Sequence, residues 1–310
     1  MSSGSFVDPR DLRNKFLRWA KVKDFSKLDG KKRESKLRSH YGRSSLTLAS
    51  QWHDLCHKTI DGKPILTKKE RDRGLKDFAM AHRFLWTYPK NATILGDNYD
   101  KNLRYASGAH LWTWIEHIAR LEKIVIFYPE DLDSEESEVL ALSIDGVDKK
   151  TWERKHPTLP KDTKNFTKKH AACGVKYQIV LCAQRKQIVD IYGPVRGGMS
   201  DKEMLERSGI LQRMRKARKK NKLASVDRGY IKFKNQAQLS WPNPQDSKET
   251  NNFKSRIRLR HETLNGKMSK YGSMNQTWRH SKEQHGIAFR AVAVTVQYAL
   301  NDGTATIYKA

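Results

Sequence analysis

The sequence predicts an α/β fold, with a mixed β-sheet flanked by helices over residues 129–310 and a small all-helical module over residues 41–128. The first observation behind this prediction is that apolar residues recur at helical intervals in the module. The second is a change, after residue 138, to short apolar or alternating runs that are typical of strands. The third is the order of the elements: three strands, a helix, a strand and further helices, as in an α/β domain with a mixed sheet.

Residues 1–40 are basic, polar and poor in large apolar side chains. We expect them to form a flexible tail with at most one marginal helix, because such a segment buries little apolar surface. The module that follows carries three apolar stripes: Leu48, Trp52 and Leu55; Phe78, Ala81 and Leu85; Leu111, Ile115 and Ile118. The stripes predict three packed helices, although a helix-turn-helix reader of DNA would show the same pattern.

Four short runs predict the strands of the sheet, after an acidic linker at residues 129–138. They are VLALSID at 139–145, GVKYQIVLC at 174–182, QIVDIYGP at 187–194 and LASVD at 223–227. Asp145 ends the first run and Asp227 ends the fourth, and strand ends are where open α/β sheets present functional groups. If the first and fourth strands are neighbours, the two aspartates come together.

Helices are predicted around this sheet. One follows the third strand, with Ser200 as its N-cap and Glu203 as the capping-box partner. Another carries Glu262 on its polar side, opposite an apolar face of Leu264, Met268 and Tyr271, although Gly266 weakens this prediction. A last helix covers residues 286–300, where the apolar stripe includes Phe289 and Val296.

The charge of the chain predicts a polyanionic partner. Lys and Arg outnumber Asp and Glu by 61 to 34, which gives a formal net charge of +27. Nucleic acid is the first expectation and an anionic membrane surface the second. The basic run at residues 213–222 predicts nuclear import or phosphate binding, although such runs are often solvated helix. Three scattered cysteines and the lack of an apolar leader or spanning run predict a protein of a reducing, intracellular compartment.

The acids at the strand ends predict a metal site within this basic chain. Asp145, Asp227 and Glu262 would repel one another unless a cation lay between them. Hard oxygen ligands suit Mg²⁺ or Mn²⁺, and two such ions would support an in-line displacement at phosphorus. Basic side chains around the site would then hold the DNA backbone. The alternative is that acids stand at strand ends by chance, as 34 acids in one chain allow.

Seven motifs, in order, resemble DDE-type transposases of the Harbinger-like superfamily, over about residues 138–310: SIDGVD, GVKYQIVLC, GPVRGGMSD, VDRGY, RLRHETLNGKMSKYG, WRHS and AVAVTVQYAL. The resemblance implies an RNase H-like catalytic domain with Asp145, Asp227 and Glu262 as its metal-binding triad. Asp145 would bridge two ions, Mg²⁺ or Mn²⁺, while Asp227 and Glu262 would each hold one. Asp201 matches an accessory acid of the family. Arg228 and Asp148 depart from the family pattern.

The resemblance implies hydrolysis of DNA at transposon ends and attack of the freed 3′-hydroxyl on target DNA. We expect double-stranded DNA as partner, a homo-oligomer on DNA, a nuclear location and no membrane partner; a separate DNA-binding protein is a further expectation. A catalytically silent descendant that binds DNA or protein is the alternative, and a nuclease without transposition is a third possibility. The expected nucleic-acid contacts are Arg213, Arg215, Lys216, Arg218, Lys219, Lys220, Arg256, Arg258, Arg260 and Arg279.

Overall fold

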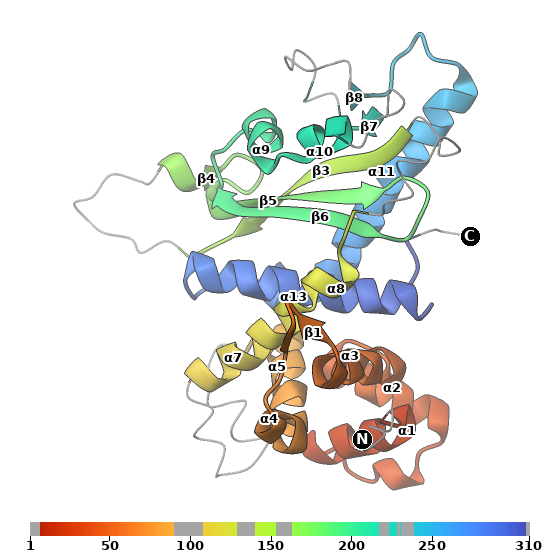
Figure 1. The fold of residues 1–310 in the computed structure, drawn as a ribbon, viewed down its shortest axis with the longest axis vertical. Helices are drawn as coiled ribbons and strands as arrows, with labels where there is room; N and C mark the ends of the chain where they lie inside the picture. The colour runs from red at the N-terminus through yellow and green to blue at the C-terminus, as the bar shows by residue number, and fades with distance from the viewer. Residues whose placement is uncertain are drawn as a thin grey trace, which may run out of the picture. The chain divides into compact units, whose positions relative to one another are not determined.

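The computed structural model describes residues 7–89, 108–128, 140–152, 163–216, 223–227, 230 and 239–307. The chain forms two compact units (Figure 1). Unit 1 comprises residues 1–125, 268–276 and 287–306; unit 2 comprises residues 126–267, 277–286 and 307–310. The last part of the chain therefore contributes to both units. No helix among the described residues is long and apolar enough to cross a membrane.

Unit 1 is helical. Its elements are α1 (Pro9–Trp19), η1 (Phe25–Lys27), α2 (Gly30–Tyr41), α3 (Ser45–His57), β1 (Thr59–Ile60), β2 (Lys63–Pro64), α4 (Lys68–Arg73), α5 (Leu75–Thr87), α7 (Gly108–Arg120), α8 (Glu122–Val125), α12 (Gly272–Asn275) and most of α13 (Lys282–Asn301). All nine residues of the three predicted stripes are buried. The stripes are therefore core, which confirms helical packing as their role. The segment GDNYDKN at residues 96–102, for which the sequence predicts a loop, and the acidic linker at 129–138 lie outside the described residues.

The prediction of a flexible tail over residues 1–40 is wrong for residues 9–19 and 30–40. These residues form α1 and α2, which bury Leu12, Phe16 and Leu17 and, in α2, Leu37 and Tyr41. The Tyr41 hydroxyl donates to the carbonyl of Phe16 at 3.0 Å. Apolar residues are few here, but a spacing of four residues places them on one face of each helix, so both helices pack on the unit.

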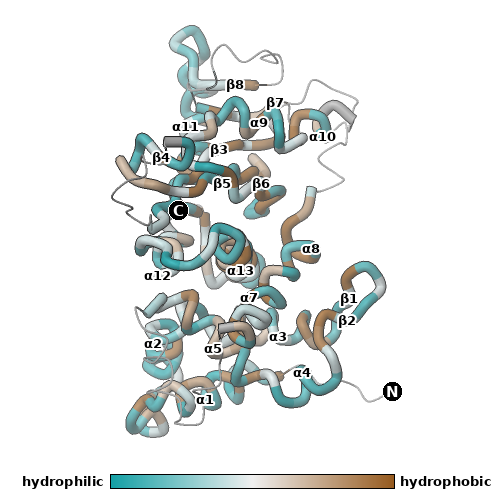
Figure 2. The backbone as a smooth tube through the Cα atoms, turned by 90° about the vertical axis from the view of Figure 1, so that its left-hand side faces the viewer, coloured by the Kyte–Doolittle hydropathy of each residue, from teal (hydrophilic) through white to brown (hydrophobic). Residues whose placement is uncertain are grey.

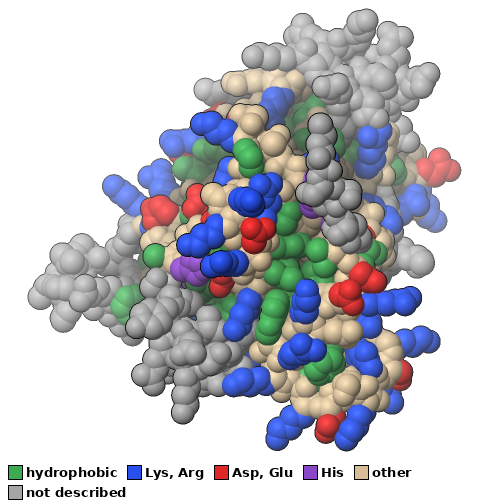
Figure 3. All heavy atoms as spheres, turned by 60° about the horizontal axis from the view of Figure 1, so that its bottom comes forward, with side chains coloured by type: hydrophobic (Ala, Val, Ile, Leu, Met, Phe, Trp, Pro, Cys, Tyr) green, Lys and Arg blue, Asp and Glu red, His purple; other side chains and the backbone are tan. Residues whose placement is uncertain are grey.

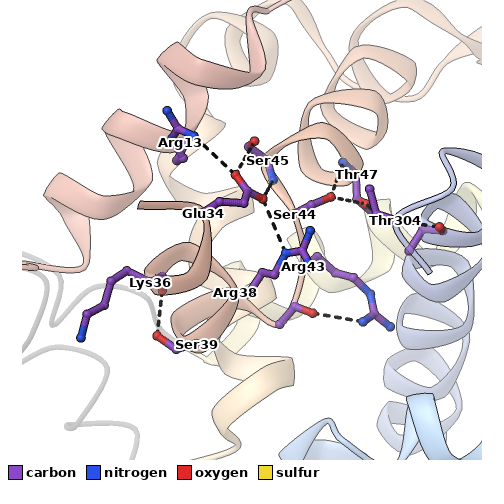
Figure 4. A network of polar contacts seen from close by, with 12 residues as sticks. Arg13, Glu34, Lys36, Arg38, Ser39, Arg43, Ser44, Ser45, Thr47 and Thr304 are labelled. Carbon is purple, nitrogen blue, oxygen red and sulfur yellow. Dashed lines mark hydrogen bonds and ion pairs between the residues drawn. The ribbon is translucent and has the colours of Figure 1, made fainter. Parts of the chain in front are cut away.

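The turn between α2 and α3 is fixed by caps and by one half-buried carboxylate. Gly42 ends α2 in the left-handed region with φ 76°, and Ser44 caps α3 by accepting from the N–H of Thr47. Glu34 of α2 accepts from the N–H and the hydroxyl of Ser45, both at 2.8 Å (Figure 4). Arg13 of α1 lies 3.7 Å from the same carboxylate, so Glu34 joins α1, α2 and α3.

Unit 2 contains the predicted mixed sheet, which confirms the α/β fold class. Its strands are β3 (Leu140–Lys150), β4 (Phe166–Thr167), β5 (Ala172–Cys182), β6 (Ile188–Arg196), β7 (Leu223–Ser225) and β8 (Leu239–Ser240). The order is β4-β5-β3-β7-β8, and β6 also pairs with β5. The pairs β3–β5 and β5–β6 are antiparallel, whereas β3–β7 and β7–β8 are parallel. This arrangement is consistent with an RNase H-like fold.

Helices pack against this sheet. The helices α9 (Asp201–Ser208) and α10 (Ile210–Lys216) bury Leu205, Ile210 and Met214 against apolar residues of β3 and β5, which carry hydrophobic colour in Figure 2. Ser200 caps α9 by accepting from the N–H of Glu203 at 3.1 Å, which confirms the predicted N-cap, but the Glu203 carboxylate faces arginines and does not complete the predicted capping box. The Glu203 carboxylate pairs with Arg207 at 2.8 Å. Most of α11 (Lys248–Met268) also belongs to this unit.

The first strand is longer than predicted. We expected it to end at Asp145, but β3 continues to Lys150, and its last residues pair with β5 from Gln178 to Gly174. The prediction failed because residues 146–150 are mostly polar, so apolar periodicity does not mark them as strand. Asp145 therefore lies in the middle of a paired strand, where the backbone is held on the β5 side.

Substitution of Gly42 tests how the α2–α3 turn is built. A methyl group at this position would lie 2.3 Å from the Trp86 ring, and the positive φ is unfavourable for alanine. We expect Gly42→Ala to lower the free energy of unfolding by about 2 kcal/mol or more in urea denaturation. Gly30→Ala is the matched control in the same helix, because nothing lies within 4 Å of its Cβ position. Equal stability of the two variants would contradict this account of the turn.

Candidate functional site

Two aspartates are placed on the same side of unit 2 by the parallel pairing of β3 and β7. Ser143 of β3 is in register with Ser225 of β7. Asp145 and Asp227 each follow two residues later, and a strand repeats its side-chain direction every two residues. Both aspartates line one pocket together with the two serines. The expectation that the first and fourth strands are neighbours is therefore confirmed.

The other wall of this pocket is the helix α11. Arg258, His261 and Glu262 line it, at helical spacings of three and four residues. Asn265, one turn beyond Glu262, reaches across with its amide nitrogen 3.5 Å from the Asp145 carboxylate. Glu262 is exposed, whereas Asp145 and Asp227 are half-buried. The structure thus brings the three predicted acids to one pocket of about 70 Å³, which is a volume for ions and water.

The pocket gathers three carboxylates, and the cationic side chain of Arg258 also lines it. Burial raises the pKa of Asp145 to about 6, the backbone N–H of Gly146 opposes this rise, and the charges of Asp227 and Asp201 add to it. The Gly146 N–H donates to the Asp145 carboxylate at 2.9 Å. Glu262 makes no hydrogen bond or ion pair with the described residues. A cation in the pocket would lower the electrostatic free energy of this cluster.

Asp201 lies on the other face of β3. Its carboxylate forms an ion pair with Lys176 at 2.8 Å, and a Cβ on Gly146 would lie 2.5 Å from its Oδ1 atom. The glycine after Asp145 therefore makes room for an acid behind the strand. Asp201 is also the first residue of α9. Asp201 does not line the pocket, and its role as an accessory acid stays a prediction.

Some residues of the site were missed by sequence reasoning. His261 is buried, and this burial lowers its pKa to about 4, while the backbone of Ser143, acting as acceptor, opposes the shift. Its imidazole is therefore neutral at pH 7. Tyr230 is also buried, and burial followed by the charges of Asp201, Asp145 and Asp227 raises the pKa of its hydroxyl. Ser143 and Ser225 were also missed, although the sequence holds a signal for them: Ser-Ile-Asp and Ser-Val-Asp repeat one pattern in the two paired strands.

The predicted nucleic-acid contacts differ in where they lie. Arg258 lines the pocket, and Arg256 and Arg279 are exposed. Arg213 is exposed and lies 3.7 Å from Asp190. Arg260 is buried, and its guanidinium donates to the carbonyl of Arg185, so it serves the fold. Outside the described residues lie the Arg215 and Lys216 side chains and the whole of Arg218, Lys219, Lys220 and Arg228. Asp148 is half-buried, and burial raises its pKa.

The residues that line the pocket offer hard oxygen donors, which are the ligands that Mg²⁺ and Mn²⁺ prefer. Burial is the main cause of the raised pKa of Asp145, and the charges of Asp227 and Asp201 add to it. Among the described residues, no three acidic, histidine or cysteine side chains are already gathered as a metal-binding group. The chemistry of these donors therefore fits a divalent ion. The three acids line the pocket but are not drawn together into a metal-binding group.

Replacing Asp145 tests the charge of the pocket without metal. A pKa raised from 3.8 to about 6 on folding gives stability below pH 4 that is lost as the pH rises through 6. At pH 7.5 in EDTA we expect Asp145→Asn to unfold with a free energy higher than that of the parent chain by about 2 kcal/mol. The measurement is urea denaturation at pH 4 and 7.5.

Asp246→Asn is the control for this prediction, because folding lowers the pKa of Asp246 whereas it raises that of Asp145. The hydrogen bond from Lys254, at 2.8 Å, lowers the pKa of Asp246. Its ionised form therefore stabilises the fold above pH 4, and Asp246→Asn lowers stability at pH 7.5. An Asp145→Asn variant that is less stable than the parent chain at pH 7.5 in EDTA would show that the pocket is not strained by charge.

Comparison with known proteins agrees with this geometry. A search of curated proteins and a search of solved structures give no match. A family model described as DDE superfamily endonuclease matches residues 144–300, just over half of the chain. The match begins within β3 and includes Asp145, Asp227 and Glu262. The resemblance to the Harbinger-like proteins is thereby confirmed, and the chain belongs to the DDE superfamily endonucleases.

Proposed function

We propose that this chain is a divalent-metal-dependent DNA nuclease and strand transferase that acts at transposon ends. The observation that carries the proposal is the pocket in which Asp145 and Asp227, from parallel neighbouring strands, face Glu262 from α11. Membership of the endonuclease family supports cleavage of a phosphodiester, and the net charge of +27 supports a polyanionic substrate.

The acids of the pocket would hold Mg²⁺ or Mn²⁺. Asp145, Asp227 and Glu262 offer the carboxylate oxygens, and a bound pair of ions would supply an activated nucleophile and charge stabilisation for the leaving oxygen. In the hydrolytic step, water attacks phosphorus and the bond to the 3′-oxygen breaks, which frees a 3′-hydroxyl. In strand transfer, that hydroxyl attacks the phosphorus of a target phosphodiester and forms a new bond to it. The bond from this phosphorus to the 3′-oxygen of the target strand breaks, and that oxygen leaves as a 3′-hydroxyl.

The other residues of the pocket would position the reactants. Arg258 would bind a phosphate oxygen of the DNA, since it lines the pocket and is exposed. Asn265 would orient the Asp145 carboxylate through its amide. The neutral His261 would fill the helix side of the pocket without adding charge, because its buried ring does not ionise at pH 7. Arg256, Arg279 and Arg213 would extend the contact along the DNA backbone.

The partners follow from this reaction. We propose double-stranded DNA as substrate and a homo-oligomer on DNA, because two transposon ends are joined in one event. A separate DNA-binding protein would supply sequence specificity if the chain itself binds only the backbone. The basic run at residues 213–222 supports a nuclear location.

Plasmid nicking tests the proposed reaction. Purified protein should convert supercoiled plasmid to open circles with Mg²⁺ or Mn²⁺ and not with EDTA. Asp227→Asn and Glu262→Gln should each lower the rate by more than the roughly 10–100-fold loss typical of outer-shell partners of a metal. Each substitution keeps the shape of the side chain and removes one charged donor.

Glu206→Gln is the matched control, because Glu206 is exposed on α9 and does not line the pocket. It should nick at the rate of the parent chain. Nicking that survives in both pocket variants would refute the assignment of the site. Absence of nicking in the parent chain, together with no effect of Mn²⁺ on thermal stability, would favour a silent DNA- or protein-binding descendant.

A further inference from the structure

The outward face of α2, in unit 1, exposes cations without acids between them. Its exposed charged residues are Lys31, Lys32, Lys36 and Arg38, and its one acid, Glu34, is half-buried. Lys32 and Lys36 are one turn apart, and like charges at this spacing destabilise an isolated helix by about 0.2–0.5 kcal/mol. A helix exposed only for solubility mixes its charges, so this face calls for another explanation.

The acids around α2 are used in local structure. Asp29 caps the helix by accepting from the N–H of Lys32 at 2.8 Å. Asp8 caps α1 in the same way through the N–H of Arg10. Glu34 is engaged by Ser45 of α3. These contacts leave cations as the exposed charged side chains of α2. Figure 3 shows that Lys and Arg side chains outnumber acidic ones on the face that it draws.

Lys32 lies 3.9 Å from Asp29 and Arg38 lies 3.7 Å from Glu34, whereas the other two cations are less engaged. Lys31 and Lys36 form no ion pair with the described residues. The positive charge of Lys36 also acts on His40 of the same helix. Burial lowers the pKa of His40, and the charges of Arg83 and Lys36 lower it further. The surface therefore has a positive potential that nearby acids do not cancel.

A hollow between α1 and α2 lies within this surface. It is lined by Arg13, Gly30, Lys31, Glu34, Ser35 and Arg38. Figure 4 shows Arg13 and Arg38 on either side of the Glu34 carboxylate, which also bonds Ser45. Cationic side chains with a serine hydroxyl beside them are typical contacts of phosphate oxygens in protein–DNA interfaces.

We propose that the α2 face, defined by Lys31, Lys32, Lys36 and Arg38 with the adjoining hollow, is a second DNA surface that binds the phosphodiester backbone without reading bases. The inference deepens the proposed function, since it rests on DNA as the substrate. Duplex DNA is favoured over a lipid surface because the apolar residues of α1 and α2 are buried and no large apolar side chain is exposed on either helix. A helix that lies in a membrane interface presents its apolar face.

Charge reversal on α2 tests this surface. The double variant Lys31→Glu/Lys36→Glu changes two side chains that make no ion pair with the described residues, so the fold should persist. Binding to a 30-base-pair duplex is measured by fluorescence anisotropy in EDTA over a range of salt concentrations. We expect at least about tenfold weaker binding, and a salt slope smaller by about 0.9 for each DNA phosphate that the lysines no longer neutralise.

The matched control is Lys58→Glu/Lys63→Glu, which lowers the net charge equally from exposed positions elsewhere in unit 1. Circular dichroism and thermal denaturation check the folding of both variants. The control should keep the salt slope of the parent chain. Equal loss of binding in the two double variants would overturn the inference, since overall charge would then explain it. Loss of binding to anionic phospholipid vesicles, with duplex binding unchanged, would also overturn it.

The nicking assay separates this inference from the proposed function. If the parent chain fails to nick but the α2 variant alone loses duplex binding, the DNA surface stands and the nuclease assignment fails. If the parent chain nicks and both double variants bind DNA equally, the nuclease assignment stands and the surface on α2 is refuted.

Discussion

The parallel pairing of β3 with β7 is the constraint on which the site depends. It places Asp145 and Asp227 at matching positions on neighbouring strands, so two carboxylates share one small pocket. Burial, together with their repulsion, raises the pKa of Asp145. The same pairing that completes the sheet therefore creates a cluster of acids that is unfavourable without a cation. Under the proposed function, such a site would give up stability in the free protein for strong binding of divalent ions.

The surroundings of the pocket hold this unfavourable arrangement in place. On one face of β3, α9 and α10 bury apolar residues of the sheet, and Asp201 occupies the space that Gly146 leaves. On the other face, α11 brings His261, Glu262 and Asn265 to the pocket. The backbone of Asp145 is fixed by β5, and its carboxylate is bonded by Gly146 and Asn265. The acids thus stand on rigid elements, which favours a defined geometry for metal ions.

Much of the site could be predicted because its signals are local. Strand-like runs end near Asp145 and Asp227, and the spacing of Leu264 and Met268 predicts which side of α11 carries Glu262. The end of β3 could not be predicted, because residues 146–150 are strand only through pairing with β5. The burial of Arg260 depends on a carbonyl 75 residues away, which no local pattern encodes. The helices α1 and α2 were missed because a few well-spaced apolar residues are enough to pack a helix against a core that other helices already form.

Anomalous diffraction from crystals soaked in Mn²⁺ tests the central claim most directly. The account predicts anomalous density in the pocket, within coordination distance of Asp145, Asp227 and Glu262, and its loss in Asp145→Asn crystals. Manganese density only at other acids, with the pocket carboxylates bound to water or to protein side chains, would contradict the assignment of these three residues as the metal-binding triad.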